Sequence, residues 1–556
     1  MKVSDYIAAF IKEQKIDTVF GYIGGMVAHL VDSISKTDGL EMVNGITEQG
    51  AGFAADGYAR QTGKVAIAIS SSGPGALNLL TPLADCFFDS IPAVFITGQV
   101  NTYEYKKYPQ LRQSGFQETD IVSVAEPITK YCQRITKPEN IRYELEKAFY
   151  IAQSGRKGPV LLDIPMDMQR QDVDVLKLEG FCKEEKTETA DDAIDEMIRL
   201  LKKSSKPVIF VGNGVRQSHS EEKLRAFLDK TGIPCVASLL GKDAIDNDYP
   251  YYLGGIGTYG NRNANLSLMN SDVLLVLGAR LDIRQTGSHP ENFAPDAHII
   301  QVDNDQKELD SLKVKKIKVF SDIGRVVDVL NGTSFDFQID DWKKTCLELK
   351  DKYPSEISVT GKQLLPNMLI KKISKHCPEK WTVTADVGQN QMWVFQSAKV
   401  KKQNRFLFSG GLGSMGFSLP AAIGVAAAGA KVLSVSGDGG FQMNLQELEV
   451  IARRKLPVKM IIFNNHSLGM IRNFQSLYFN GKYPSSQEDY STPDFSKVAN
   501  AYGIKAQTKA ANDIDDDVLR GFFETEEAEL LEIALPVGTT VEPQVIFGNN
   551  LDRMSP

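Results

Sequence analysis

An acidic residue and an amide residue follow two apolar segments in a spacing that can hold a divalent ion against a diphosphate. Asp438 follows the apolar segment 432–436, and Asn465 follows the apolar segment 458–463. If these segments are neighbouring parallel strands, their carboxyl ends meet at one edge of a sheet, where open α/β folds bind ligands. Hard oxygen ligands that leave room for phosphate oxygens suit Mg²⁺. The sequence therefore predicts a Mg²⁺ site at Asp438 and Asn465.

A crossover helix has to connect the two strands if they run parallel. The segment between them places Leu445, Leu448 and Ile451 at helical spacing, which predicts one buried face. A Gly-Asp-Gly sequence alone is a common turn. The complete order of strand, acidic turn, helix, strand and paired Asn is much more specific.

The rest of the chain predicts an α/β fold of three domains, each a mostly parallel sheet flanked by helices. The predicted domains span residues 1–170, 190–335 and 360–556. Apolar strands separated by helical stretches give the middle domain a doubly wound topology. Charge-dense segments at 169–192 and 332–360 are predicted linkers.

Composition limits the classes of partner. The chain has 556 residues, 42% of them hydrophobic, and a formal net charge of -7. Charges of both signs are interspersed, so no basic stripe predicts binding to nucleic acid or to an anionic membrane. The six cysteines form no Cys-x-x-Cys pair, which favours free thiols in a reducing cytoplasm.

No segment of the chain predicts a membrane span or a secretion signal. The first residues form a polar helical pattern without the apolar core of a signal peptide, so no targeting segment is expected. The apolar stretch 409–430 is interrupted by six glycines and Pro420. It is therefore predicted to form a buried core helix rather than a membrane span.

Four segments resemble the thiamine-diphosphate-dependent enzymes, and within them the acetolactate synthase catalytic subunit and its close relatives. The segments are 47–60, 70–100, 409–424 and 437–449. The resemblance extends from Asp5 to about Asp552. It implies a pyrimidine-binding first domain, a central domain with a potential FAD site, and a third domain that binds diphosphate and Mg²⁺.

The same resemblance implies roles for residues around the thiamine ring system. Glu48 would hydrogen-bond the aminopyrimidine, Met415 would support the bent cofactor, and the carbonyl of Gly413 would accept from the amino group. Without the family motif, Glu48 would be interpreted as a helix-capping carboxylate and Met415 as a core side chain.

Further ligands are implied for the diphosphate and the metal. Glycine turns and helix N-termini offer backbone donors to phosphate oxygens. The implied diphosphate contacts are Gly439, Gly440, Gly469 and Met470, with Gln389 and Asn390 on the other side of the pocket. The implied Mg²⁺ ligands are the side chains of Asp438 and Asn465 and the backbone carbonyl of Ser467, and His466 is interpreted as an exposed loop residue.

Substrate contacts are implied by two loops. Phe116 and Gln117 would face the reacting centre, and Gly25 would leave room for a 2-oxo acid. Ile471 and Phe474 would line the substrate pocket. The family has Trp where this chain has Phe474, so the acceptor substrate stays open.

The resemblance leaves the binding of FAD open. Arg280 lies in a turn, 278–282, that resembles the FAD-binding turn of the family. However, the family's Gly-Met-His-Gly segment is replaced by Gly257-Thr258-Tyr259-Gly260. An NAD site is not predicted, because the glycines at 21–25 do not have the G-x-G-x-x-G spacing.

The function implied is that of a thiamine-diphosphate-dependent decarboxylating carboligase. Pyruvate would be decarboxylated to a hydroxyethyl carbanion on the cofactor, which is then ligated to a second carbonyl compound. The alternatives are an aldehyde or keto-sugar acceptor, simple 2-oxo acid decarboxylation, a non-catalytic paralogue and an oxidoreductase. A homodimer or homotetramer is implied, because Glu48 and the diphosphate site lie in different domains. A regulatory small subunit stays open.

Overall fold

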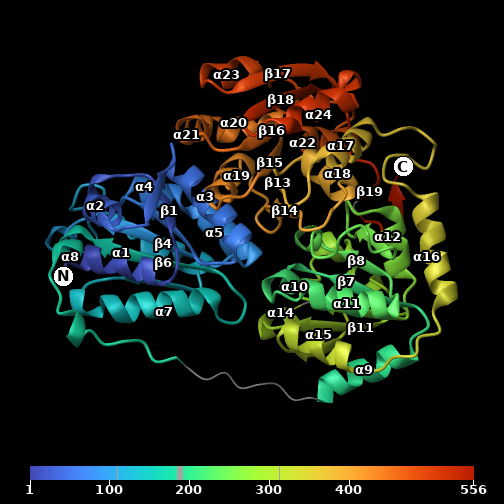
Figure 1. The fold of residues 1–556 in the computed structure, drawn as a ribbon, viewed down its shortest axis with the longest axis horizontal. Helices are drawn as coiled ribbons and strands as arrows, with labels where there is room; N and C mark the ends of the chain where they lie inside the picture. The colour runs from blue at the N-terminus through green and yellow to red at the C-terminus, as the bar shows by residue number, and fades with distance from the viewer. Residues whose placement is uncertain (109, 184–191, 312–313, 547, 556) are drawn as a thin grey trace.

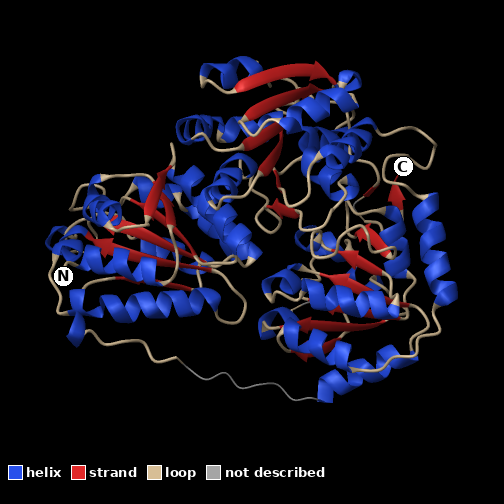
Figure 2. Cartoon of the chain, in the orientation of Figure 1, coloured by secondary structure: helices blue, strands red, loops and turns tan. Residues whose placement is uncertain are grey.

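Three six-stranded parallel sheets, each flanked by helices, form the fold in this computed structural model (Figures 1 and 2). The structure describes residues 1–556 except 109, 184–191, 312–313, 547 and 556. The predicted α/β class with three parallel sheets is confirmed. In the described part of the chain, no helix combines the length and the apolar character that crossing a bilayer requires. All six cysteines are free thiols.

The N-terminal sheet (blue in Figure 1) has the strand order β2-β1-β3-β4-β6-β5. Its strands are β1 (Thr18–Gly21), β2 (Glu41–Asn44), β3 (Ala66–Ser70), β4 (Ala93–Gln99), β5 (Tyr131–Arg134) and β6 (Pro159–Pro165). Its helices are α1 (Val3–Glu13), α2 (Ala28–Lys36), α3 (Glu48–Thr62), α4 (Pro74–Asn78), α5 (Leu80–Asp89), α6 (Ile121–Ala125), α7 (Ile141–Gln153) and α8 (Met166–Arg170).

The C-terminal sheet (orange to red in Figure 1) repeats this order as β14-β13-β15-β16-β18-β17. Its strands are β13 (Thr382–Ala385), β14 (Arg405–Phe408), β15 (Val432–Gly437), β16 (Val458–Asn464), β17 (Lys505–Ala510) and β18 (Glu529–Ala534). Its helices are α17 (Leu365–His376), α18 (Gln389–Ser397), α19 (Ser418–Ala427), α20 (Asp438–Met443), α21 (Leu448–Arg454), α22 (Gly469–Tyr478), α23 (Phe495–Ala501) and α24 (Asp516–Glu524). In both sheets the strand order reverses beside the first strand, which is where such folds bind ligands.

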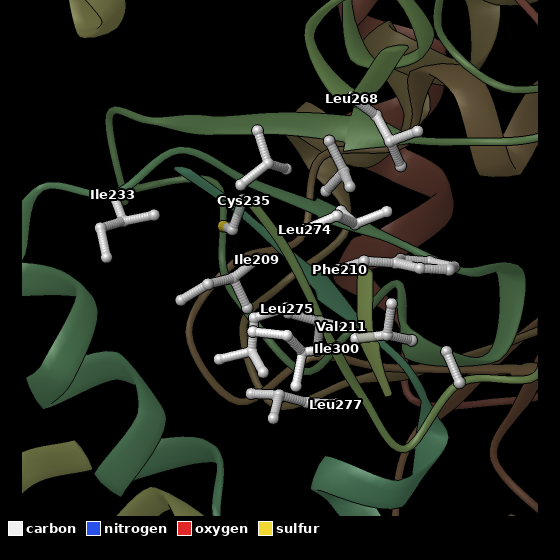
Figure 3. Close-up of a cluster of buried hydrophobic side chains, with 14 of the residues drawn as sticks. Ile209, Phe210, Val211, Ile233, Cys235, Leu268, Leu274, Leu275, Leu277 and Ile300 are labelled. Atoms are coloured by element: carbon white, nitrogen blue, oxygen red, sulfur yellow. The ribbon is translucent and has the colours of Figure 1, made fainter. Parts of the chain in front are cut away.

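The central sheet has the order β12-β11-β10-β7-β8-β9, which is the doubly wound order predicted for this domain. Its strands are β7 (Pro207–Val211), β8 (Cys235–Ala237), β9 (Tyr252–Gly255), β10 (Val273–Leu277), β11 (His298–Asp303) and β12 (Ile317–Phe320). Its helices are α9 (Asp192–Lys203), α10 (Asn213–Gln217), α11 (Glu221–Thr231), α12 (Arg262–Met269), α13 (Ile283–Thr286), α14 (Gln306–Asp310), α15 (Ile323–Gly332) and α16 (Asp340–Lys352). Figure 3 shows its core, in which side chains such as Phe210 and Leu274 pack together.

Helices α3 and α19 join the first and third domains through one shared apolar core. Small residues allow the two backbones to approach closely, since a Cβ at Gly57 would lie 2.2 Å from the carbonyl oxygen of Ala421. Phe53 and Phe417 pack edge to face across the same contact, with centroids 5.7 Å apart. The predicted buried helix within 409–430 is α19, and it belongs to this core.

The structure corrects two predictions of local structure. The segment 332–360, predicted as a linker, contains helix α16. Its Trp342 and Cys346 are one turn apart and buried, and the Trp342 Nε1–H donates to the carbonyl oxygen of Pro207 at 3.1 Å. The other predicted linker, 169–192, lies partly outside the described residues, at 184–191.

The single crossover helix predicted after Asp438 is also wrong. The chain forms α20, a short 3-10 turn over Leu445–Glu447, and then α21. The break falls at Asn444, whose side chain donates to the carbonyl oxygen of Gly416 at 2.7 Å. A buried amide that serves a neighbouring loop competes here with a continuous helix.

Candidate active site

The carboxyl edge of the C-terminal sheet brings Asp438, Asn465 and Ser467 together. Strands β15 and β16 are parallel, and their register pairs Gly437 with Phe463. Asp438 is the first residue of α20, directly after β15, and Asn465 directly follows β16. The Ser467 hydroxyl donates to the Asn465 Oδ1 at 3.1 Å. The three residues are buried.

Asp438 is a buried carboxylate with several hydrogen-bond donors but, in the described part of the chain, no ion pair with a basic side chain. Tyr490 donates its hydroxyl to Asp438 Oδ2 at 3.2 Å. Burial raises the pKa of Asp438 to about 6, against the lowering effect of Tyr490 and of the backbone N–H groups of Gly439 and Ser467. Burying a carboxylate without a full counter-charge costs free energy, so a bound cation would stabilise the ionised form of Asp438.

The loop after β16 turns at His466, which adopts a left-handed backbone. Its φ is 50°, and its N–H donates to Asn464 Oδ1 at 3.0 Å. Histidine tolerates this region better than most residues. Gln389, at the start of α18, accepts from Asn465 Nδ2 at 2.8 Å, which orients the Asn465 amide. His466 is exposed, as predicted.

The neighbouring glycines pack closely against protein side chains. A Cβ at Gly440 would lie 2.5 Å from Asp386 Oδ1, and one at Gly469 would lie 2.1 Å from Gln389 Oε1. A Cβ at Gly439 would lie 2.6 Å from Leu468 Cδ2. Close packing against side chains therefore accounts for all three, in addition to the predicted approach of a diphosphate.

Substituting Gly440 with alanine is expected to destabilise the apo protein by about 1–3 kcal/mol, because the new methyl group overpacks a buried site. Asp386 cannot move away, since its carboxylate already accepts from two backbone N–H groups. The measurement is the midpoint of thermal unfolding. Gly521→Ala is the matched control, because a Cβ there has no neighbour within 4 Å inside α24. Gly521→Ala should raise the unfolding midpoint slightly. Equal changes of the midpoint in the Gly440 and Gly521 variants would contradict the packing argument.

Asp386 is a site residue that the sequence reasoning missed. It follows β13 as Asp438 follows β15, and this repeated order of strand and Asp is the signal that could have found it. Its two oxygens accept from the N–H groups of Gly416 at 2.9 Å and Ser418 at 3.0 Å. Burial raises the pKa of Asp386 to about 7. Asn390 donates to the backbone carbonyl of Asp386 at 2.7 Å, which ties α18 to the same edge.

Gly413 and Met415 lie in the loop before α19. Gly413 has a φ of 73°, and a Cβ there would meet no heavy atom within 4 Å. Met415 reaches the loop after β15, where its Cε would lie 3.2 Å from a Cβ at Gly439. The loop therefore presents Gly413 to an open space and Met415 to the Asp438 side.

Glu48 begins helix α3 at the carboxyl edge of the N-terminal sheet. The N-cap is Thr47, whose hydroxyl accepts from the Gly50 N–H at 3.0 Å. Glu48 is half-buried, and its Oε2 accepts from Asn78 Nδ2 at 2.9 Å. Its side chain is thus directed toward α4 and is not needed as the cap.

Glu447 is a second residue that the sequence reasoning missed. Its buried carboxylate comes from the C-terminal domain and accepts from the N–H groups of Ile46 at 3.2 Å and Thr47 at 3.0 Å. It therefore fixes the backbone just before Glu48. The partners are separated by 400 residues, so no local pattern could have revealed this contact.

The substrate-loop residues lie on the N-terminal domain. Phe116 is 79% exposed. Gln117 has a φ of 65° and packs against Gly73, where a Cβ would lie 2.9 Å from the Gln117 Cβ. Strained non-glycine backbone of this kind is concentrated at functional sites. Gly25 borders open space, since a Cβ there would meet nothing within 4 Å.

Glu48 and Gln117 lie in one part of the candidate site, and Asp438 and Asn465 lie in another. Among the described residues, no hydrogen bond or ion pair connects Glu48 or Gln117 with Asp438 or Asn465. Helix α22 carries Met470, which is partly buried, and the more exposed Ile471 and Phe474, at 53% and 54%. Glu48 and Phe474 thus belong to surfaces on different domains of the same chain.

A cavity of about 870 Å³ lies where all three domains meet. It opens at the switch point between β7 and β10, where doubly wound sheets bind nucleotides. Arg280 lines it and also forms an ion pair with Asp282 at 3.6 Å. Gln285 lines it too, and its Oε1 is buried without a hydrogen-bond partner.

The residues present fit the predicted groups. The edge at Asp438 offers a buried carboxylate and amide oxygens, which is a hard donor set suited to Mg²⁺ and a phosphate group. The cavity offers an unpaired acceptor and a cation within a volume in the usual range for organic ligands, about 300–1,000 Å³.

Comparisons with known proteins agree with this geometry. Residues 1–124 match the model of the thiamine pyrophosphate enzyme N-terminal TPP binding domain, residues 194–330 match the central domain, and residues 386–533 match the C-terminal TPP binding domain. The acetolactate synthase isozyme 2 large subunit of Escherichia coli (strain K12) is 36% identical, over 100% of this chain and 99% of that protein. The acetolactate synthase large subunit of Lactococcus lactis is 34% identical over 99% and 95%, and the probable acetolactate synthase large subunit of Methanocaldococcus jannaschii is 36% identical over 100% and 95%.

Proposed function

Because the chain belongs to the thiamine pyrophosphate enzyme family, among the acetolactate synthase large subunits, we propose that it is a thiamine-diphosphate-dependent carboligase of the acetolactate synthase type. It decarboxylates a 2-oxo acid, pyruvate, and ligates the remaining two-carbon unit to a second carbonyl compound. The observation that carries the proposal is the buried edge at which Asp438, Asn465 and Ser467 meet. The units 1–170, 190–335 and 360–556 serve as pyrimidine-binding, central and diphosphate-binding domains.

Thiamine diphosphate, when bound, supplies a carbon nucleophile and an electron sink for decarboxylation. The residues of the chain bind the diphosphate end of this cofactor. Asp438, Asn465 and the carbonyl of Ser467 hold Mg²⁺. The diphosphate is held by the backbone at Gly439, Gly440, Gly469 and Met470, with Gln389 and Asn390 orienting the pocket.

The ring system is held by both halves of the site. Met415 would support the ring system, and the Gly413 carbonyl would accept from its amino group. Glu48 holds the proton at the ring nitrogen of the pyrimidine. Phe116, Gln117 and Gly25 face the 2-oxo acid, and Ile471 and Phe474 limit the acceptor.

Each complete site needs a second copy of the chain. Glu48 lies in a half-site that is bordered by exposed apolar side chains, among them Tyr22 at 42%, Ile23 at 52% and Leu77 at 43%. An exposed apolar surface around polar groups is typical of a subunit interface. The proposed assembly is a homodimer, with a homotetramer as a pair of such dimers, and the free thiols suit the cytoplasm.

Mixed dimers test this arrangement. Glu48→Gln and Asp438→Asn chains are each expected to be nearly inactive alone. After unfolding and refolding as an equimolar mixture, they should regain about a quarter of wild-type activity, because half of the dimers are mixed and each has one intact site. No recovery, although the two chains demonstrably exchange, would show that each chain builds its site alone.

The central cavity is proposed to bind FAD. Arg280 supplies a cation and Gln285 an unpaired acceptor, and Gly214 and Gly278 line the cavity at the switch point, where their backbones pack closely together. The test is a titration of the flavin-free protein with FAD, followed by flavin fluorescence. Arg280→Ala should weaken binding. Unquenched flavin at saturating protein would contradict the proposal.

The function itself is tested by identifying products by mass spectrometry after incubation with pyruvate, Mg²⁺ and thiamine diphosphate. Acetolactate is the expected product. Consumption of pyruvate without acetolactate would favour the alternative that Phe474 suggests, an aldehyde or keto-sugar acceptor. Intact pyruvate under all conditions would refute the proposed donor.

A further inference from the structure

Two buried aspartates of the N-terminal domain hold the backbone of residues 409–416, which we name the cofactor loop because it carries Gly413 and Met415. Asp89 uses both oxygens. Its Oδ1 accepts from the Gly411 N–H at 2.6 Å, and its Oδ2 accepts from the Gly410 N–H at 3.0 Å. Because the two donors are adjacent residues, this contact fixes both the position and the orientation of the backbone.

Asp85 holds the same loop through a relay. The Ser409 hydroxyl donates to Asp85 Oδ1, and its oxygen accepts from the Ser414 N–H at 2.9 Å. Ser414 directly precedes Met415. The far end of the loop is held separately, since Asp386 accepts from the Gly416 N–H at 2.9 Å. Carboxylates therefore anchor the loop on both sides, and Gly413 stands free between them.

The cluster is charge-compensated by a single guanidinium. Arg60 donates its Nε–H to Asp56 at 2.5 Å, and its Nη2 lies 2.9 Å from Asp89 and 3.4 Å from Asp85. All four side chains are almost completely buried. Arg60 also donates to the carbonyl oxygen of Phe408 at 2.9 Å, just before the loop. Three carboxylates thus share one cation, and burial raises the pKa values of Asp56 and Asp85.

The association of the first and third domains does not require this cluster of charged residues. The first and third domains already share the apolar core between α3 and α19, which provides the burial. A buried ionic cluster seldom adds stability over apolar packing, and its best-attested use is to specify one arrangement. Here the specified element is the segment that carries two of the proposed cofactor contacts.

We propose that Asp85 and Asp89, together with Arg60, are positioning residues that fix the cofactor loop for thiamine diphosphate. This inference rests on the proposed function of Gly413 and Met415. The N-terminal domain then has two roles. Its Glu48 edge serves the site shared with the partner, and its Asp85–Asp89 segment shapes the diphosphate half-site of its own chain.

The test compares three variants by the dissociation constant for thiamine diphosphate at saturating Mg²⁺, measured calorimetrically. Asp89→Asn should bind at least about tenfold more weakly, because the amide NH2 replaces one of the two oxygens that accept from Gly410 and Gly411, so that one backbone N–H faces another donor, and Arg60 loses a counter-charge. Asp85→Ala should also lose about tenfold, since Ser409 is left without its acceptor. Asp85→Asn should stay within about threefold of the wild type, because the amide oxygen can still accept from the Ser409 hydroxyl.

Glu529→Gln is the control for general destabilisation. Glu529 is a buried carboxylate of the C-terminal domain, paired with Lys459 at 3.2 Å, and among the hydrogen bonds of the described residues it makes none to the cofactor loop. A structural role alone would lower the unfolding midpoint without changing the affinity for thiamine diphosphate. Wild-type affinity in Asp89→Asn and Asp85→Ala would therefore overturn the inference.

Failure of the proposed function is distinguishable from failure of this inference. If the wild type does not bind thiamine diphosphate, the proposed function is wrong whatever the variants do. If the wild type binds but Asp89→Asn does not fold, Asp85→Ala and Asp85→Asn decide the question. Equal affinities of these two variants would overturn the inference, and a tenfold difference would support it.

Discussion

Replacing Glu48 with glutamine is expected to lower turnover with pyruvate by about 10²–10⁴-fold, the usual contribution of a positioned proton-transfer group. The amide keeps the length of the side chain and can still accept from Asn78, which donates at 2.9 Å in the native protein. It cannot hold a proton for the pyrimidine nitrogen. The affinity for thiamine diphosphate should therefore change much less than the turnover number.

The measurement is steady-state kinetics together with direct titration of the cofactor. Glu41→Gln is the matched control, because Glu41 is an exposed carboxylate of the same domain that pairs with Arg454 at 2.6 Å. Its turnover should equal that of the wild type. If Glu48→Gln turned over pyruvate as fast as the Glu41 variant, Glu48 would not be the catalytic carboxylate.

The observed bounds of helix α3 coincide with local sequence signals. Thr47 and the glycine-rich segment after it mark the start of α3, and Gly63, with a φ of 71°, ends it. Strands β15 and β16 were likewise predicted almost to the residue, because buried parallel strands are short apolar runs. The juxtaposition of Asp438 and Asn465 then follows from parallel pairing alone.

Contacts between distant segments could not be predicted in this way. Asp89 holds Gly411 across 322 residues, and Glu447 holds Thr47 across 400. Both carboxylates lie in segments whose local sequence pattern is that of an ordinary helix. Helix α16 was missed because its apolar face is narrow, with only Trp342 and Cys346 fully buried against the central domain. Tertiary packing decided the structure in each case.

Replacing Asp438 with asparagine is expected to have opposite effects on the apo and the loaded protein. Mg²⁺ affinity should fall by about 100-fold or more, because Asp438 is the only charged side chain in the proposed set of metal ligands. Thiamine diphosphate should then no longer raise the unfolding midpoint, since a ligand stabilises only the state that binds it. Turnover should be lost at ordinary Mg²⁺ concentrations.

The apo protein should be at least as stable as the wild type. Burial raises the pKa of Asp438 to about 6, so the ionised carboxylate at neutral pH is a cost to the folded state that the neutral amide removes. Because its pKa is raised, the Asp438 carboxyl group binds a proton more tightly in the folded state than in the unfolded state. The stability that comes from this bound proton is lost as the pH rises through about 6. Calorimetric scans with and without Mg²⁺ and thiamine diphosphate measure both effects. A lower apo midpoint combined with an intact cofactor-induced shift would show that Asp438 supports the fold and does not bind the metal.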